Sequence, residues 1–128
     1  MTKIPPLAIA VAALVASYAI GALIALATGV GELSQVLGNG TKLSAPLFLI
    51  VVEVLAAAAI LTRRAVLPGA LVLAAASGLS LAAAAFDGDV AHDGLTAAQV
   101  AWQAVEVACS AAVFALAVTR IRRRPAAA

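Results

Sequence analysis

The sequence contains few charged residues. Only 11% of its 128 residues are Asp, Glu, Lys or Arg, whereas 65% are apolar. A soluble domain normally has about a quarter charged residues, because these side chains cover the surface that faces water. A chain with less than half of that share lacks the polar surface of a soluble protein. Lipid accepts apolar side chains on the outside of a protein as well as inside, so the composition indicates an integral membrane protein.

Residues that ligate metals or carry redox chemistry are also scarce. The one cysteine, Cys109, cannot form a disulfide within the chain. The one histidine, His92, excludes a bis-histidine haem and a Cys/His zinc site within one chain. A phosphate loop, a dinucleotide fingerprint, a Gly-x-Ser-x-Gly elbow and a His-Glu-x-x-His motif are all missing. We therefore predict no cofactor and expect no classical soluble-enzyme activity.

Four long apolar stretches are present, at residues 5–28, 45–62, 66–86 and 97–119. Each is close to the ~20 residues that a helix needs to cross the hydrocarbon core of a bilayer. The link around Arg63-Arg64 is so short that it predicts an antiparallel pair of helices. The sequence thus predicts an all-α, integral membrane, up-down four-helix bundle as a single domain over residues 1–128, with a basic tail at residues 120–128.

Local signals mark the ends of these stretches. Residues 44–46, Ser-Ala-Pro, predict an N-cap with proline in the first turn. Residues 96–99, Thr-Ala-Ala-Gln, have the spacing of a capping box. The first stretch also resembles a signal peptide, with Lys3 before it and Ala-Leu-Ala at 25–27. Its apolar core is longer than the ~7–15 residues of a signal peptide, however, so we expect an uncleaved helix.

Basic residues are distributed unevenly between the two predicted membrane sides. If the four stretches span the membrane, Lys42 lies on one side and all other basic residues lie on the opposite side: Lys3, Arg63, Arg64, Arg120, Arg122, Arg123 and Arg124. Cytoplasmic loops carry an excess of Lys and Arg, so the pattern predicts that both termini are cytoplasmic. We predict the plasma (inner) membrane of a bacterium as the location. The arginine cluster is expected to contact anionic lipid headgroups rather than nucleic acid.

Two acids, Glu53 and Glu106, lie inside the apolar stretches. An ionised acid at the bilayer centre costs roughly 2.5–3.5 kcal/mol on an insertion scale. Glu53 follows Ser44 by nine residues and Glu106 follows Thr96 by ten, so a rise of ~1.5 Å per residue predicts that both lie in one layer near mid-membrane. No Lys or Arg lies within the stretches to neutralise them. We therefore expect at least one protonated glutamate, two that share a proton, or a bound cation in its place.

The last stretch has a polar face. Its polar residues recur at helical spacing, which places them on one side of a helix: Gln99, Gln103, Glu106 and Ser110. Tyr18 lies near the middle of the first stretch, where its hydroxyl needs a hydrogen-bond partner. We expect Glu53, Glu106, Gln103 and Tyr18 to face a common interior.

The loop between the last two stretches is a weaker candidate site. Three carboxylates and an imidazole that can ligate a divalent cation fall within it: Asp87, Asp89, His92 and Asp93. The later glutamate of a calcium loop is missing. A solvated acidic turn is therefore the preferred interpretation.

Three functions remain open from the sequence. The chain is either a non-enzymatic membrane component that packs against a copy of itself or within a larger membrane complex, or it binds or translocates a proton, a cation or a small substrate. In the second case Glu53 and Glu106 are the titrating pair, with Gln103, Gln99 and Tyr18 as hydrogen-bond partners. An enzyme that acts on a lipid substrate is the third alternative. The sequence places the first function slightly ahead, because buried Glu and Gln side chains also hydrogen-bond between membrane helices.

Overall fold

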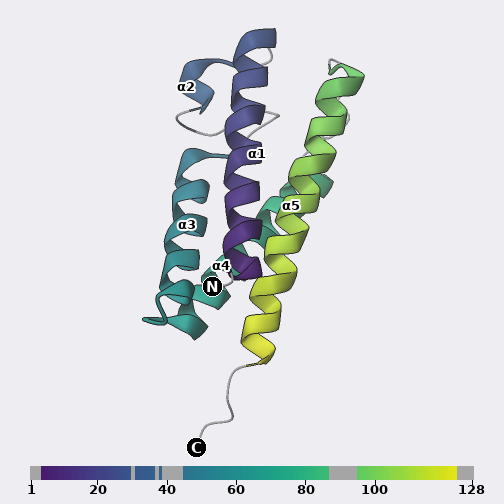
Figure 1. The fold of residues 1–128 in the computed structure, drawn as a ribbon. Helices are drawn as coiled ribbons and strands as arrows, with labels where there is room; N and C mark the ends of the chain where they lie inside the picture. The colour runs from purple at the N-terminus through teal and green to yellow at the C-terminus, as the bar shows by residue number, and fades with distance from the viewer. Residues whose placement is uncertain (1–3, 30, 37, 39–44, 87–94, 124–128) are drawn as a thin grey trace, which may run out of the picture.

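The structure, a computed structural model, describes residues 4–29, 31–36, 38, 45–86 and 95–123. The described part forms five helices: α1 (Pro6–Thr28), α2 (Leu33–Val36), α3 (Leu47–Leu61), α4 (Val66–Phe86) and α5 (Ala97–Arg122). No strand occurs within these ranges, so the all-α prediction is confirmed for them. The four longer helices run side by side, and the single turn of α2 lies next to the end of α1 (Figure 1).

Three helices are long and apolar enough to cross a membrane: α1 over Pro6–Thr28, α4 over Val66–Ala85 and α5 over Ala97–Arg122. The structure is therefore compatible with a membrane protein. The prediction of a fourth span at residues 45–62 has less support, because α3 has only 15 residues. At ~1.5 Å per residue it is about 22 Å long, against a hydrocarbon core of about 30 Å.

The two ends of α3 explain its length. Pro46 is the N-cap, with an extended backbone and no side-chain cap, so the prediction that it lies in the first turn after a Ser44 cap is wrong. Ser44 lies outside the described residues. At the other end Thr62 is the C-cap, and Arg63 then adopts a positive φ of 59°, which a continuing helix does not allow. The turn that follows connects α3 directly to α4.

The helices pack in the cyclic order α1, α5, α4, α3. The closest neighbours are α4 with α5, α3 with α4 and α1 with α5, and α1 contacts α3 less extensively. Helices α3 and α5 consequently lie on a diagonal across the interior. Gly69 allows α4 to approach α3, since a Cβ atom at this position would lie 2.9 Å from the Ala56 carbonyl oxygen.

The distribution of side chains is the reverse of that in a soluble protein. Leu23, Phe48, Leu55 and Leu79 are each 60% or more exposed, whereas Glu53 is completely buried. In water, large apolar side chains would be inside and carboxylates outside. Exposed apolar side chains together with a buried carboxylate are compatible with a protein surrounded by lipid.

The interior has two parts that differ in chemistry. The apolar half is formed by the buried residues nearest the Arg63-Arg64 turn: Leu7, Val11, Leu14, Ala56, Ala57, Ile60, Ala70, Leu73, Val113 and Ala117. The polar half contains Ser17, Tyr18, Glu53, Ser77, Gln99, Gln103, Glu106 and Ser110, together with Ala22, Ala25 and Leu49. Each of the four longer helices has buried residues in both halves. Consecutive helices run in opposite directions, so they pass through the two halves in opposite order.

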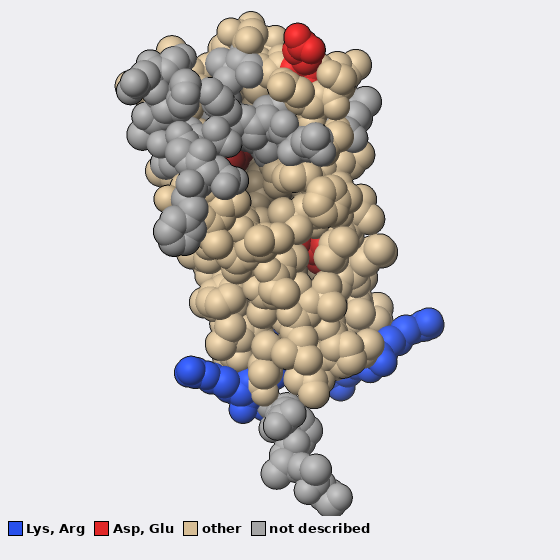
Figure 2. Space-filling model, turned by 180° about the vertical axis from the view of Figure 1, so that it is seen from behind, with Lys and Arg blue, Asp and Glu red and all other residues tan. Residues whose placement is uncertain are grey.

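The described charges on the surface separate along the same axis. Arginine side chains gather at the end of the molecule next to the apolar half, as the blue atoms in Figure 2 show. They belong to the α3–α4 turn and to the last turn of α5. The start of α2, which Glu32 directly precedes, lies at the opposite end (Figure 1). Lys3, Lys42 and Arg124 lie outside the described residues.

Candidate functional site

Glu53 is the most deeply buried carboxylate that the structure describes. Its side chain has no exposed surface, and neither carboxylate oxygen has a hydrogen-bond partner. Glu53 lies on the buried face of α3 between Leu49 and Ala56, where the polar half gives way to the apolar half. A charged group in such a place is costly unless a proton, a cation or a hydrogen-bond donor compensates it.

Glu106 lies on the buried face of α5. It is 8% exposed, and its Oε1 atom is buried without a hydrogen-bond partner. Gln99, Gln103 and Ser110 share this face, and each of them is buried as well. The structure therefore places the predicted polar face of this helix toward the interior.

No direct hydrogen bond joins the two glutamates. The oxygens of Glu53 have no hydrogen-bond partner, so the two carboxyls do not share a proton through a direct hydrogen bond. Glu53 precedes Arg63 by ten residues and Glu106 precedes Arg120 by fourteen, a difference of about 6 Å along a helix. The predicted common layer assumed that the helices start at equal heights, whereas α3 begins well below the start of α5 in Figure 1.

Tyr18 links the helices that carry the polar residues. Its hydroxyl lies 3.2 Å from the hydroxyl of Ser110, which joins α1 to α5, and the ring is buried. Tyr18 therefore connects α1 to the buried polar face of α5.

Gln99 has a structural role. The backbone N–H of Thr96 donates to Gln99 Oε1 (2.8 Å), and the backbone N–H of Gln99 donates to Thr96 Oγ1 (3.2 Å), so the predicted capping box is confirmed. Gln99 Nε2 also donates to Thr28 Oγ1 (2.8 Å) and fixes the start of α5 to the end of α1. These bonds use both ends of the amide, which leaves Gln99 poorly placed to bind a ligand.

Two further buried hydroxyls, those of Ser17 and Ser77, are satisfied within their own helices. Ser17 Oγ donates to the Leu14 carbonyl oxygen (2.7 Å) and Ser77 Oγ donates to the Leu73 carbonyl oxygen (2.6 Å). Both oxygens of Glu53 and Oε1 of Glu106 differ from these hydroxyls, because they lack a hydrogen-bond partner.

Trp102 forms a contact that the sequence analysis did not predict. Its indole N–H donates to the backbone carbonyl oxygen of Ser17 (3.0 Å), which adds a third link between α1 and α5. Indole N–H groups in apolar surroundings need an acceptor. A tryptophan in an apolar stretch therefore indicates that its N–H has an acceptor, although the acceptor could not be identified from the sequence.

The predicted acidic loop lies outside the described residues, and with it Asp87, Asp89, His92 and Asp93. In the part of the chain that the structure does describe, no three His, Cys, Asp or Glu side chains gather as metal ligands would. Cys109 is a free, half-buried cysteine one turn from Glu106.

The fold and the site define a helical protein that is compatible with membrane insertion and has a polar interior. No protein-family model, curated protein or solved structure matches the chain.

Proposed function

We propose that the chain is a membrane-spanning four-helix bundle that binds a small cation in its polar half in exchange for a proton. The observation that carries this proposal is the carboxylate of Glu53, which is fully buried with both oxygens unpartnered. Removing a carboxylate from water is costly, and a proton or a cation is what lowers that cost.

The charge distribution supports an orientation with both termini in the cytoplasm. The described arginines lie at one end of the molecule (Figure 2), and the excess of basic residues marks the cytoplasmic side. Helix α1 starts at this end, α3 returns to it and α5 finishes there. In this proposal α3 completes the bundle as a fourth, shorter crossing of the plasma membrane.

The two halves of the interior support access from the side opposite the arginines. The apolar half contains tightly packed residues such as Leu14, Leu73 and Val113, none of which has exposed surface. An ion does not enter such a region without losing its water. The polar half begins on the far side of this barrier, so a ligand would reach Glu53 and Glu106 from outside the cytoplasm.

The chemistry of the polar half favours a cation as the ligand. Carboxylate and hydroxyl oxygens are the ligands that hard cations prefer, and they also accept hydrogen bonds from organic cations such as guanidinium. Glu53, Glu106, Tyr18 and Ser110 supply these groups. Within the described ranges, no Lys or Arg lies in this half to compete with the cation.

Assembly with a copy of itself or with a partner is the second candidate function, and the geometry gives it less support. A polar anchor for assembly would lie on the outer surface, whereas both glutamates are buried inside. The small residues Ser17, Gly21 and Ala25 form a spacing that suits close helix contacts, and they too are buried within the chain. The third candidate, an enzyme acting on lipid, has no specific observation in its favour.

Proton release on cation binding tests the proposal. The full chain is purified in detergent with a pH indicator and minimal buffer, and sodium, potassium, methylammonium and guanidinium chlorides are added in turn. We expect at least one of them to release up to about one proton per chain, since ligands must lose protons before they bind a cation. A one-for-one exchange also lowers the apparent cation affinity about tenfold per pH unit on acidification.

Two variants make the test specific. Glu53→Gln keeps the size of the side chain but removes its exchangeable proton, so proton release should disappear. Glu32→Gln is the matched control, because Glu32 is an exposed acid at the outer end of the molecule and its loss should change nothing. Folded wild-type protein that releases no proton with any of the four salts would refute the proposal.

A further inference from the structure

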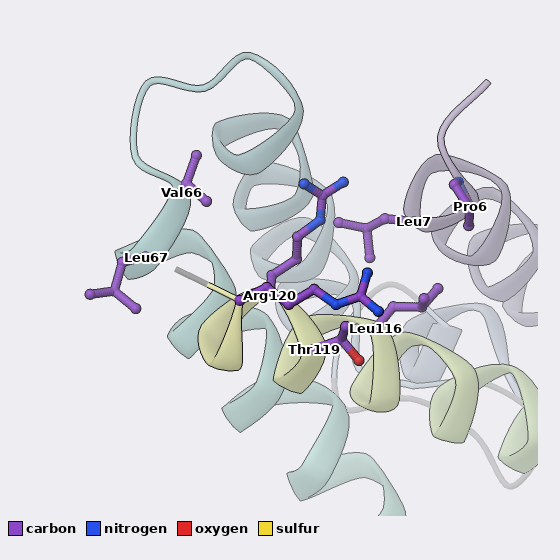
Figure 3. A pocket seen from close by; sticks show the side chains of 8 residues that line it. Pro6, Leu7, Val66, Leu67, Leu116, Thr119 and Arg120 are labelled. Carbon is purple, nitrogen blue, oxygen red and sulfur yellow. The ribbon is translucent and has the colours of Figure 1, made fainter. Parts of the chain in front are cut away.

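A groove lies at the basic end of the molecule, well away from Glu53 and Glu106. It has a volume of about 530 Å³ and is bounded by the start of α1, the start of α4 and the end of α5. Its apolar walls include Leu7, Val66 and Leu116, and its polar residues are Thr119, Arg120 and Arg123. Figure 3 shows the apolar walls on three different helices, with arginine side chains from the end of α5 reaching over the space between them.

The two arginines of this groove have no acidic partner. The side chains of Arg120 and Arg123 form no ion pair or hydrogen bond with any residue that the structure describes. Glu53 and Glu106 are buried in the other half of the interior, and Glu32 lies at the opposite end. A planar guanidinium presents a fork of N–H donors that fits the oxygens of a phosphate. The groove therefore has the charge that complements an anion.

The backbone adds to this positive character. Helices α1 and α4 both begin at the groove, and the N-cap of α1, Pro5, offers no side chain to its first amide groups. The N-terminus of a helix carries a partial positive charge. These helix ends reinforce the arginines, which remain the principal anion-binding groups.

The apolar walls show what else the ligand must contain. Leu7, Val66 and Leu116 would gain nothing from a free inorganic anion, whereas a hydrocarbon chain would pack against them. In the proposed orientation the groove lies where the hydrocarbon core meets the cytoplasmic headgroups, a region that contains anionic lipids. We infer that the groove binds one anionic phospholipid, with its phosphate at Arg120 and Arg123 and part of an acyl chain against the apolar walls.

This inference is separate from cation exchange and needs its own test. The full-length protein is purified in a neutral detergent, and the binding of dioleoyl phosphatidylglycerol is measured by native mass spectrometry against dioleoyl phosphatidylcholine. We expect at least one phosphatidylglycerol to remain bound under conditions that remove phosphatidylcholine. In a thermal-melt arm, phosphatidylglycerol should raise the unfolding temperature, and inorganic phosphate at the same concentration should not.

A matched pair of double variants separates a site from general charge attraction. Arg120→Gln with Arg123→Gln removes both groove arginines and should lower the affinity for phosphatidylglycerol about thirtyfold, at roughly fivefold per interfacial arginine. Arg64→Gln with Arg122→Gln removes the same charge from the same end but from outside the groove lining, and it should lower affinity less than about threefold, because more distant charges act through screened attraction.

Three outcomes would overturn the inference. Equal losses in the two double variants would mean that only net charge attracts the lipid. Equal stabilisation by inorganic phosphate would mean that the apolar walls play no part. Equal binding of phosphatidylcholine would mean that the arginines do not select the headgroup. Proton release by sodium or guanidinium should be unchanged in both double variants, so a failure of the cation proposal would leave this test intact.

Discussion

The apolar half and the polar half of the interior are built from the same four helices but differ in packing and in hydrogen bonding. In the apolar half, Gly69 lets the backbones of α3 and α4 approach closely, and side chains such as Leu14 and Leu73 have no exposed surface. In the polar half, the hydroxyls have partners, while both oxygens of Glu53 and Oε1 of Glu106 do not. The apolar half therefore offers close packing, and the polar half contains buried oxygens without a hydrogen-bond partner.

The source of stability also differs from that of a soluble protein. Lipid tails are as apolar as a leucine side chain, so burying leucine between membrane helices gains little from the hydrophobic effect. Close packing provides the gain instead, through many small dispersion contacts. Substitutions on either side of the boundary should therefore separate packing from polar interactions.

The largest effect is expected where the helices are closest. Gly69→Val places a branched side chain against the Ala56 carbonyl oxygen, which a Cβ atom would approach to 2.9 Å. We expect a loss of about 3 kcal/mol in the free energy of unfolding, at the upper end of the overpacking range. Denaturation by sodium dodecyl sulfate, followed by circular dichroism, measures this.

Gly78→Ala is the control for Gly69→Val. Its Cβ would lie 3.1 Å from the ring of Phe114, a side chain that can move, so a loss below about 1 kcal/mol is expected. Equal losses at the two glycines would show that close backbone approach is not special to the apolar half.

The boundary between the apolar half and the polar half can be tested on helix α4. Leu73 and Ser77 are one turn apart on α4, and both are fully buried. Leu73→Ala should cost about 2 kcal/mol, because it leaves a cavity in a packed region. Ser77→Ala removes a hydrogen bond to the backbone of its own helix and should cost about 0.6 kcal/mol or less. The same denaturation measurement applies, and a reversed order would contradict the division into two halves.

A smaller effect of opposite sign is expected at Glu53. Glu53→Met replaces a carboxylate that has no partner with an apolar chain of similar length, so the free energy of unfolding should rise by about 1 kcal/mol. Cation-induced proton release should disappear in the same variant. Glu32→Met, at an exposed position, should change neither property. A destabilised Glu53→Met protein would indicate that the carboxylate contributes to packing.

The smallest effect is expected for the link between α1 and α5. Tyr18→Phe removes the hydroxyl that lies 3.2 Å from Ser110 Oγ, and a hydrogen bond between membrane helices averages about 0.6 kcal/mol. A double-mutant cycle with Ser110→Ala should give a coupling of that size. A cycle of Tyr18→Phe with Thr119→Ala, at the far end of α5, should give none. Absence of coupling in the first cycle would show that the hydrogen bond between Tyr18 and Ser110 does not stabilise the protein.

Much of the helical pattern could be predicted from the sequence. The ranges expected for the first and third stretches agree with α1 and α4 to within a residue. Helix α5 starts at the predicted Ala97 but continues to Arg122, three residues beyond the expected end, because hydropathy falls at the arginines while helix propensity does not. The length of the apolar stretch did not predict the bounds of α3, because its ends are set by Pro46 and by the positive φ of Arg63.

The inward orientation of the site residues could be predicted from the sequence, but their positions relative to one another could not. Helical spacing on the last stretch was sufficient to expect that Gln103, Glu106 and Ser110 face inward together. The relative heights of Glu53 and Glu106 depend on where each helix starts, which local sequence does not determine. The link from Trp102 to Ser17 depends on how α1 is rotated against α5. Such rotations depend on the packing of all the helices together, so they cannot be predicted from the sequence of any single stretch.

The short length of α3 has a consequence for the surrounding lipid. The 26 residues of α5 span about 39 Å, whereas the 15 residues of α3 span about 22 Å. In the proposed orientation, with α3 as a fourth crossing, a bilayer that follows both helices would be thinner beside α3, at a modest cost for every ångström of mismatch. We therefore expect the protein to favour thin membranes, and headgroups and water to come nearest to Glu53 on the side where α3 meets the lipid.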